Sequence, residues 1–217
     1  TSAGTDRVPM DAVKALGVTL HTARGVYSIP MAEHAIWGVL SLYRRADYFL
    51  ANQKSAVWEK HRWLMELCGK TVCILGCGSV GTECARRFQA FGCRVIGIAT
   101  TEREQAFFDE VRSVDDLDTV LPDADVIILA LPLTEDTKGL LDSMRIGRMK
   151  QDAVLVNISR GAVVDEAALT RALSRHRISG AVLDVFEEEP LPADSPLWDL
   201  DNVIVTPHNS FVGDGNA

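Results

Sequence analysis

The sequence has no excess of positive charge and no long apolar run. Its 217 residues hold 22 Lys and Arg against 30 Asp and Glu, a formal net charge of -8. This balance argues against a nucleic-acid surface, which needs a basic face. No run of about 18 uncharged apolar residues occurs, so we expect no membrane span. Residues 1–17 lack the basic-then-apolar pattern of a secretory signal. With 47% hydrophobic and 24% charged residues, the composition is that of a globular protein.

A metal-binding or disulfide pattern of cysteines is also missing. Five cysteines fall within 68–93, but none forms a Cys-x-x-C pair and no histidine lies among them. Zinc ligands show closer spacing, so we expect no metal site and interpret the thiols as small residues that fill gaps between a helix and a sheet. An odd number of thiols without a disulfide framework favours a reducing compartment, and we expect a cytoplasmic protein.

Six apolar runs of strand length follow one another from Thr71 onward, with helical patterns between them. Strands without polar alternation are covered on both faces, which is typical of a parallel sheet with helices on each side. We therefore predict an α/β fold, a doubly wound parallel sheet of the Rossmann type. The runs are 71–76, 94–99, 125–132, 153–159, 179–185 and 202–207, and the clearest helices are 80–92 and 165–176.

The part before Thr71 has a different pattern. Residues 18–23 resemble a strand, and residues 28–53 read as one long helix that is apolar on more than one side. A helix that is apolar all round must be buried. We predict that a second copy of the chain covers it, which makes a homodimer; an intrachain core helix is the alternative. Residues 56–67 continue this helical dimerisation arm, and their two tryptophans suit an interface.

A glycine pattern follows the first apolar run and opens a helix. Gly76, Gly78 and Gly81 match G-x-G-x-x-G. The first glycine allows a tight turn, the second lets the backbone approach a pyrophosphate, and the third lets the helix pack close to the strand. The helix N-terminus then offers N–H groups to the phosphates. In this context the pattern predicts a dinucleotide site.

The acid that usually ends the second strand of such a site is missing. An acid there holds the ribose hydroxyls of NAD and repels a 2′-phosphate. In its place stands Ala99, followed by Thr100, Thr101 and Arg103. The hydroxyls and the guanidinium are donors for a 2′-phosphate, although acidic residues flank Arg103 on both sides. The cofactor is therefore NAD or NADP, with a slight preference for NADP; a surface loop without preference is the alternative.

Three polar residues follow later strands, at the edge where doubly wound sheets bind ligands. They are Arg160, Glu189 and His208. An arginine binds a carboxylate with its planar fork, and a histidine exchanges protons near neutral pH. A carboxylate beside the imidazole favours its charged form. These groups suit reduction of a 2-oxo acid by a nicotinamide, but each also has a plain interpretation as a surface ion pair, a solvated acid or a turn residue.

Several stretches, taken together, resemble the D-isomer-specific 2-hydroxyacid dehydrogenase family. They are "SAGTDRV", "MAEHAIWGVLSLYRR", "LCGKTVCILGCGSVG", "LALPLTEDTKGLLD", "VLVNISRGAVVDEAAL", "GAVLDVFEEEPLP" and "NVIVTPHNS". The resemblance implies a nucleotide domain inserted into a substrate domain and a dimer formed through the nucleotide domain. It also implies the catalytic roles described above for Arg160, Glu189 and His208.

The resemblance implies contacts for further residues. Ser79 and Val80 would contact the pyrophosphate, and Thr137 would contact the cofactor. Ile158 and Ser159 would line the nicotinamide side, Asp184 would bind the carboxamide, and Asn209 and Ser210 would lie near the same ring. The backbone around Ala3 and Gly4 would hold the substrate carboxylate, and Tyr27 would lie near the interdomain cleft.

The resemblance also predicts the domain boundaries. Residues 1–24 would be a remnant of the substrate-binding domain, and 25–217 the NAD(P)-binding domain with its arm at 28–67. With most of the substrate domain missing, we expect this chain to bind nucleotide but to turn over poorly, because the cleft cannot close. The predicted function is an oxidoreductase for a small 2-oxo or 2-hydroxy acid, of the D-2-hydroxyacid dehydrogenase or glyoxylate/hydroxypyruvate reductase type. The alternatives are a dinucleotide-sensing protein like the dehydrogenase-like corepressors and a formate- or phosphite-type dehydrogenase.

Overall fold

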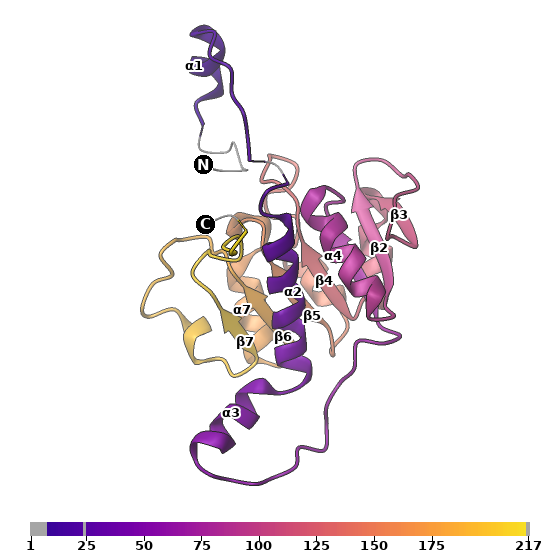
Figure 1. The fold of residues 1–217 in the computed structure, drawn as a ribbon, viewed down its shortest axis with the longest axis vertical. Coiled ribbons are helices and arrows are strands. Elements are labelled where there is room, and N and C mark those ends of the chain that lie inside the picture. Colours follow the sequence, from indigo (N-terminus) through magenta and orange to yellow (C-terminus); the bar gives the residue numbers. More distant parts are fainter. Residues whose placement is uncertain (1–7, 24, 216–217) are drawn as a thin grey trace.

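A parallel sheet forms the centre of the protein. The computed structural model describes residues 8–23 and 25–215, and within these ranges seven strands pair in the order β3-β2-β1-β4-β5-β6-β7 (Figure 1). Every pairing is parallel. The strands are β1 Thr71–Leu75, β2 Arg94–Ala99, β3 Glu110–Ser113, β4 Val126–Leu129, β5 Val154–Asn157, β6 Gly180–Leu183 and β7 Val203–Val205. The chain winds outward from β1 in both directions, which confirms the predicted doubly wound fold.

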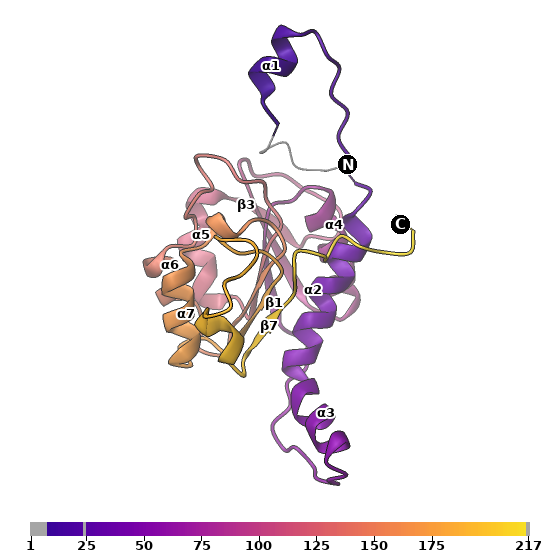
Figure 2. The same cartoon turned by 90° about the vertical axis from the view of Figure 1, so that its left-hand side faces the viewer.

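Helices cover both faces of this sheet, as the edge-on view in Figure 2 shows. One face carries α2 (Ser28–Tyr43) and α4 (Ser79–Ala90), and the other carries α5 (Leu117–Val120), α6 (Ser143–Arg148) and α7 (Glu166–Ser174). The remaining helices are α1 Met10–Ala15 and α3 Ala46–Lys54, with short 3-10 turns at Val114–Asp116, Leu121–Asp123, Gly161–Val163 and Pro196–Asp199. Within the described ranges no helix has both the length and the hydropathy that crossing a bilayer requires.

The strand interiors are buried without alternation because each face of the sheet has its own core. Along β1, Cys73 and Leu75 pack toward the α5–α7 side, whereas Val72 and Ile74 pack toward α2 and α4. Burying one such side chain contributes about 1.5–3 kcal/mol. The six predicted apolar runs each contain one observed strand. The seventh, β3, was missed because "EVRS" is short, polar and at the edge of the sheet.

Helix α2 packs against the sheet with its small residues. Ala32, Ala35 and Val39 are fully buried in the core between α2, α4 and the sheet. This face therefore finds an intrachain partner, while Ile29 and Trp37 on the outside are about half exposed, at 51% and 49%. The predicted homodimer stays a prediction.

The single helix predicted over 28–53 is wrong, since the structure has two helices there. The break lies at Arg44 and Arg45, and Arg45 adopts a left-handed backbone with φ of 52°. Its guanidinium forks onto the Asp47 carboxylate, with Nε–Oδ1 of 3.1 Å and Nη2–Oδ2 of 2.9 Å. A left-handed residue ends an α-helix, and this ion pair holds the turn that starts α3.

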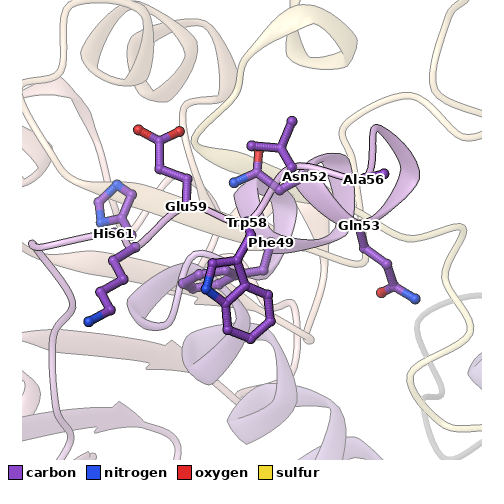
Figure 3. Close-up of a pocket in the computed structure, with 9 residues that line it drawn as sticks. Phe49, Asn52, Gln53, Ala56, Trp58, Glu59 and His61 are labelled. Carbon is purple, nitrogen blue, oxygen red and sulfur yellow. The ribbon is translucent and has the colours of Figure 1, made fainter.

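The helical continuation predicted over 56–67 is wrong as well. This segment is irregular, and its first residue, Ala56, has a left-handed φ of 52°. It borders a hollow of about 700 Å³ beside α3, shown in Figure 3. Phe49 and Trp58 supply aromatic surface there, and Trp58 is 99% exposed. The strand predicted over 18–23 is also wrong, because these residues pair with no described strand.

Candidate functional site

The glycine turn joins β1 to α4 in the shape that the motif predicts. Gly76 has φ of 100°, and a Cβ placed there would lie 2.5 Å from the Ala130 carbonyl oxygen. At Gly81 a Cβ would lie 1.9 Å from the Gly76 oxygen, which excludes any side chain. A Cβ on Gly78 would meet no atom within 4 Å. The turn is thus closed against the sheet and open on its outer side, where a phosphate can approach the backbone.

The start of α4 adds hydrogen-bond donors to this open side. Gly78 is the N-cap and no side chain caps the helix. The helical ladder begins with Thr82, whose N–H donates to the Gly78 oxygen at 2.9 Å. The N–H groups of Ser79, Val80 and Gly81 precede this bond and have no acceptor within the helix. With the positive end of the helix dipole, they fit a dinucleotide pyrophosphate.

The loop after β2 folds onto the glycine turn. Arg103 Nε donates to Gln105 Oε1 at 2.9 Å, and Gln105 Nε2 donates to the Cys77 oxygen (2.9 Å) and to Thr82 Oγ1 (2.8 Å). The Arg103 Nη2 atom lies 3.5 Å from the same Cys77 oxygen. Gln105 therefore holds the guanidinium beside the turn, where β2 ends at Ala99. The sequence carried no signal for Gln105, which stands in a charged stretch without a motif.

The thiols lie mostly in the core. Four of the five cysteines are buried, and Cys68 is exposed. Burial raises the pKa of Cys77 to about 11 and that of Cys84 to about 12, so both are neutral thiols near pH 7. Within the described part of the chain, no group of three or more His, Cys, Asp or Glu side chains has a metal-binding arrangement.

His208 and Glu189 meet at the edge where the parallel strands end. His208 Nδ1 lies 2.8 Å from Glu189 Oε2, and Glu189 Oε1 accepts the Phe186 N–H at 3.2 Å. Both residues line a cavity of about 410 Å³ with Trp198. The two residues come from loops that follow neighbouring strands, β6 and β7, and this explains how residues 19 positions apart in the sequence come into contact.

Arg160 also lies near Glu189. It follows β5, and together with Glu189 it lines a second cavity, of about 460 Å³. Its Nη1 donates to the Ser159 oxygen at 2.7 Å. Asn157, at the end of β5, supports this turn: its Nδ2 donates to the Arg160 oxygen (3.0 Å) and its Oδ1 accepts the Ser159 hydroxyl (2.9 Å). Sequence reasoning missed Asn157, although a polar residue closing a buried strand was a usable signal.

The charge around this second cavity is negative apart from the arginine. Glu187 and Glu188 line it with Arg160. Burial raises the pKa of the neighbouring Glu166, and the negative charges of Glu187 and Glu188 raise it further. The hydrogen bond that the Glu187 N–H donates lowers this pKa but does not outweigh the other causes. That bond joins the Glu187 nitrogen to Glu166 Oε2 over 2.9 Å. An anionic ligand in this cavity therefore depends on Arg160 for its attraction.

Asp184 holds the turn that carries His208. It is completely buried, and its Oδ1 accepts the Thr206 hydroxyl (2.6 Å) and the Asn209 N–H (3.0 Å). Its Oδ2 accepts the Ser210 N–H at 3.0 Å. The observed role of Asp184 is thus to fix backbone on the C-terminal side of His208, and the predicted contact with a carboxamide stays a prediction.

The remaining predicted residues lie along the same edge or outside the described ranges. Thr137 Oγ1 accepts the Thr134 N–H (2.7 Å) and donates to the Pro132 oxygen (2.8 Å), which shapes the loop after β4. Ile158 and Ser159 are buried at the end of β5. Tyr27 packs edge-on against Phe211, with ring centroids 5.5 Å apart. Ala3 and Gly4 lie outside the described residues.

Comparisons with known proteins agree with this architecture. The chain is 38% identical over 207 residues to a D-3-phosphoglycerate dehydrogenase of Methanocaldococcus jannaschii, covering 94% of this chain and 39% of the relative. It is 36% identical over 214 residues to a glyoxylate reductase of Pyrococcus furiosus, covering 94% and 63%. The structure of an NADPH-dependent glyoxylate/hydroxypyruvate reductase from Sinorhizobium meliloti superimposes with a TM-score of 0.81 at 31% identity, covering 88% and 98%.

The chain spans only part of the curated relatives, 39% of the first and 63% of the second. Residues 36–210 match the family model described as "D-isomer specific 2-hydroxyacid dehydrogenase, NAD binding domain". That match covers well over half of the sequence, and the chain therefore belongs to the D-isomer-specific 2-hydroxyacid dehydrogenase family.

Proposed function

We propose that this chain is the nucleotide-binding and proton-donating part of an NAD(P)-dependent oxidoreductase that interconverts a small 2-oxo acid and its 2-hydroxy acid. The observation that carries the proposal is the 2.8 Å contact between His208 and Glu189, beside the cavity that Arg160 lines. The names of the relatives, glyoxylate reductase and glyoxylate/hydroxypyruvate reductase, support the substrate class. In this proposal residues 1–24 end a substrate domain, 25–217 form the nucleotide domain, and the enzyme works in the cytoplasm.

Each of the three side chains has one task in the reaction. Arg160 binds the substrate carboxylate with its planar fork and polarises the neighbouring carbonyl. His208 donates a proton to the carbonyl oxygen from Nε2, because Nδ1 is engaged with Glu189. Glu189 fixes the orientation of the imidazole through its contact with Nδ1, which leaves Nε2 directed to the substrate. A nicotinamide bound at this site would supply the hydride for the carbonyl carbon.

The residues that would hold the nucleotide lie along the edge that begins at the glycine turn. Ser79 and Val80 hold the pyrophosphate through their N–H groups, and Thr137 contacts the cofactor farther along. Around the nicotinamide we place Ile158, Ser159, Asp184, Asn209 and Ser210. Backbone around Ala3 and Gly4 assists Arg160 with the substrate carboxylate.

The cofactor in this proposal is NADP rather than NAD. Ala99 brings no negative charge against a 2′-phosphate, and Thr100 and Thr101 offer hydroxyls next to it. The stronger support is Arg103, which Gln105 holds at the glycine turn through a 2.9 Å hydrogen bond. A guanidinium held in this position forms charge-assisted hydrogen bonds with a phosphate.

We also infer a homodimer formed through the outer side of α2 and α3. Trp37 on α2 is 49% exposed, and Trp58 and Trp63, on the irregular segment that follows α3, are 99% and 85% exposed. Large exposed aromatic residues are typical of protein interfaces. Sedimentation equilibrium measures the state directly, and Trp58→Ser should shift it toward monomer; a monomeric wild-type protein contradicts this inference.

An assay of nicotinamide oxidation tests the proposed function. The complete protein that carries these residues is mixed with NADPH and with glyoxylate, hydroxypyruvate or pyruvate. We expect oxidation with at least one 2-oxo acid, and Arg160→Gln should raise the KM for that acid about a hundredfold because the carboxylate loses its partner. Arg148→Gln, at an exposed arginine on α6, is the matched control.

One outcome overturns the proposal in favour of a binding protein. If the protein binds NADPH but oxidises it with none of the three acids, the nucleotide-sensing alternative gains support. The 217-residue chain itself should bind NADPH and turn over far more slowly than the complete protein; equal rates contradict the proposed division into domains.

A further inference from the structure

A chain of hydrogen bonds links helix α2 to the turn that carries His208. His34 Nε2 lies 3.2 Å from Thr206 Oγ1, and that hydroxyl donates to Asp184 Oδ1 over 2.6 Å. Because the Thr206 hydroxyl donates its only proton to Asp184, it can only accept a hydrogen bond from His34. The Nε2 atom of His34 therefore carries the ring N–H. Asp184 in turn accepts the N–H groups of Asn209 and Ser210, each at 3.0 Å.

The turn at the end of this chain needs support. His208 has a left-handed φ of 52°, and its N–H reaches back to the Thr206 oxygen at 3.1 Å. A residue with a Cβ adopts that backbone only where its surroundings hold it. Asp184 accepts the two N–H groups that follow His208 and is itself completely buried. The position of its carboxylate therefore depends on all of its hydrogen-bond donors, including the Thr206 hydroxyl.

His34 is suited to be the outermost donor. Burial lowers its pKa, and the charge of Asp184 raises it by less, so the ring is neutral near pH 7 and carries one N–H. Its ring also packs on Trp37, with centroids 5.2 Å apart. The imidazole is therefore held on one side by an aromatic neighbour and on the other by the Thr206 hydroxyl.

An aromatic contact joins the same two parts of the molecule independently. Tyr27, which immediately precedes α2, packs edge-on on Phe211 with centroids 5.5 Å apart, and Phe211 packs edge-on on His208 at 6.3 Å. The C-terminal segment passes across the start of α2 in Figure 2. The position of His208 thus depends on α2 through polar and aromatic contacts alike.

We propose that His34 is a positioning residue, which acts through Thr206 and Asp184 to orient the turn so that His208 meets Glu189. This inference rests on the proposed function, in which His208 is the proton donor. It makes α2, which on the primary sequence is far from the reacting groups, part of the framework of the active site.

Paired substitutions at Thr206 test the middle of the chain. Thr206→Val keeps the shape and removes the hydroxyl, and we expect it to lower kcat about tenfold or more and to raise the NADPH dissociation constant by a smaller factor, since misplaced catalytic groups slow chemistry more than binding. Thr206→Ser restores the hydroxyl and should recover most of the loss. Thr170→Val removes a comparable hydroxyl on α7, bonded to the Glu166 oxygen, and should leave kcat unchanged.

Substitutions at His34 test the outer end of the hydrogen-bond chain. They also provide a second test in case the Thr206 variants fail to fold. His34→Phe removes the donor and should lower kcat several-fold, whereas His34→Gln supplies an N–H and should recover part of the loss. Because both residues act through one path, the double variant Thr206→Val with His34→Phe should lose no more than Thr206→Val alone. Additive losses, or Thr206→Ser as poor as Thr206→Val, would overturn the inference.

A spectroscopic signature separates this inference from the proposed function. The proton on His208 Nδ1, hydrogen-bonded to Glu189, gives a downfield NMR signal that needs no turnover. We expect Thr206→Val and His34→Phe to weaken that signal and Thr206→Ser to keep it. If the wild-type protein reduces no 2-oxo acid, the proposed function fails while this signal still decides the positioning role; an unchanged signal in both variants contradicts it.

Discussion

The glycine turn after β1 and the histidine turn after β7 reach the same edge of the sheet by different physical means. The glycine turn is shaped by missing side chains, because a Cβ on Gly76 or Gly81 would collide with backbone atoms. The histidine turn is shaped by side chains that are present: Asp184 holds its N–H groups, and Glu189 holds the imidazole. The shape of the glycine turn is set by a few neighbouring residues, whereas the hydrogen bonds that hold the His208 turn join residues that are far apart in the sequence.

The largest expected effect tests the steric side of this comparison. Gly81→Ala places a Cβ 1.9 Å from the Gly76 oxygen, and we expect it to lower the free energy of unfolding by about 3 kcal/mol or more, because backbone atoms cannot give way as side chains do. Gly78→Ala meets no atom within 4 Å and should leave stability nearly unchanged while weakening NADPH binding. Thermal unfolding and nucleotide titration measure both; equal destabilisation by the two variants contradicts the comparison.

The next effect tests the contact between Glu189 and His208. Glu189→Gln keeps the size of the side chain but removes its charge, and we expect kcat to fall about a hundredfold, the order of a general acid–base contribution. The NADPH dissociation constant and the unfolding temperature should change little. Glu66→Gln, at an exposed acid that lines neither cavity, is the matched control. Equal kcat in the two variants would show that the contact with His208 has no part in the chemistry.

A smaller effect concerns the loop that folds onto the glycine turn. Arg103→Ala should weaken NADPH binding about tenfold and leave NADH binding unchanged, since one charge-assisted hydrogen bond at a surface contributes about 1.5 kcal/mol. Arg86→Ala, on α4 and paired with Glu83 at 2.8 Å, is the control. Nicotinamide fluorescence measures both affinities, and an equal loss for NADH and NADPH contradicts a role in selecting the 2′-phosphate.

The smallest effect concerns Asp125, which lies at the end of the strands opposite the candidate site. Burial raises the pKa of Asp125, but hydrogen bonds from Lys150 and the Thr71 N–H and the charge of Lys70 outweigh it and hold the pKa below the ordinary value. A lowered pKa stabilises the fold above the ordinary carboxyl range and less as the pH falls through it. Asp125→Asn should therefore cost about 1 kcal/mol near pH 7, and the cost should shrink below about pH 4.

Denaturant unfolding at several pH values measures this difference. Asp118→Asn, at the partly exposed pair with Arg145, is the control and should cost less than about 0.5 kcal/mol. A cost for Asp125→Asn that does not depend on pH contradicts the ionic origin of this stabilisation.

Most of the sheet was predictable because its interior strands are apolar on both faces. The glycine turn was predictable for the reason given above. Strand β3 was not, since only Val111 of "EVRS" is buried, and an edge strand needs few apolar residues. The apolar pattern over 28–53 hid the break at Arg45, where a left-handed backbone is accompanied by an ion pair with Asp47. Apolar spacing carries no information about such a pair.

The candidate site was predictable as a set of strand ends but not as a network. Arg160, Glu189 and His208 follow strands of a parallel sheet, and this places them on one edge. Asn157 and Thr206 orient the site through polar contacts. Asn157 had a partial signal in its place at the end of a buried strand, whereas Thr206 had none. Their side chains are ordinary in sequence and gain a role through the register of neighbouring strands.

The most direct test of the central claim is the rate of hydride transfer in a single turnover with His208→Gln. The variant keeps a polar side chain but lacks an acid that can donate a proton near pH 7. With NADPH bound at wild-type affinity, we predict that reduction of the preferred 2-oxo acid falls at least about a hundredfold across the pH range. Wild-type hydride transfer in His208→Gln at every pH would contradict the assignment of His208 as the proton donor.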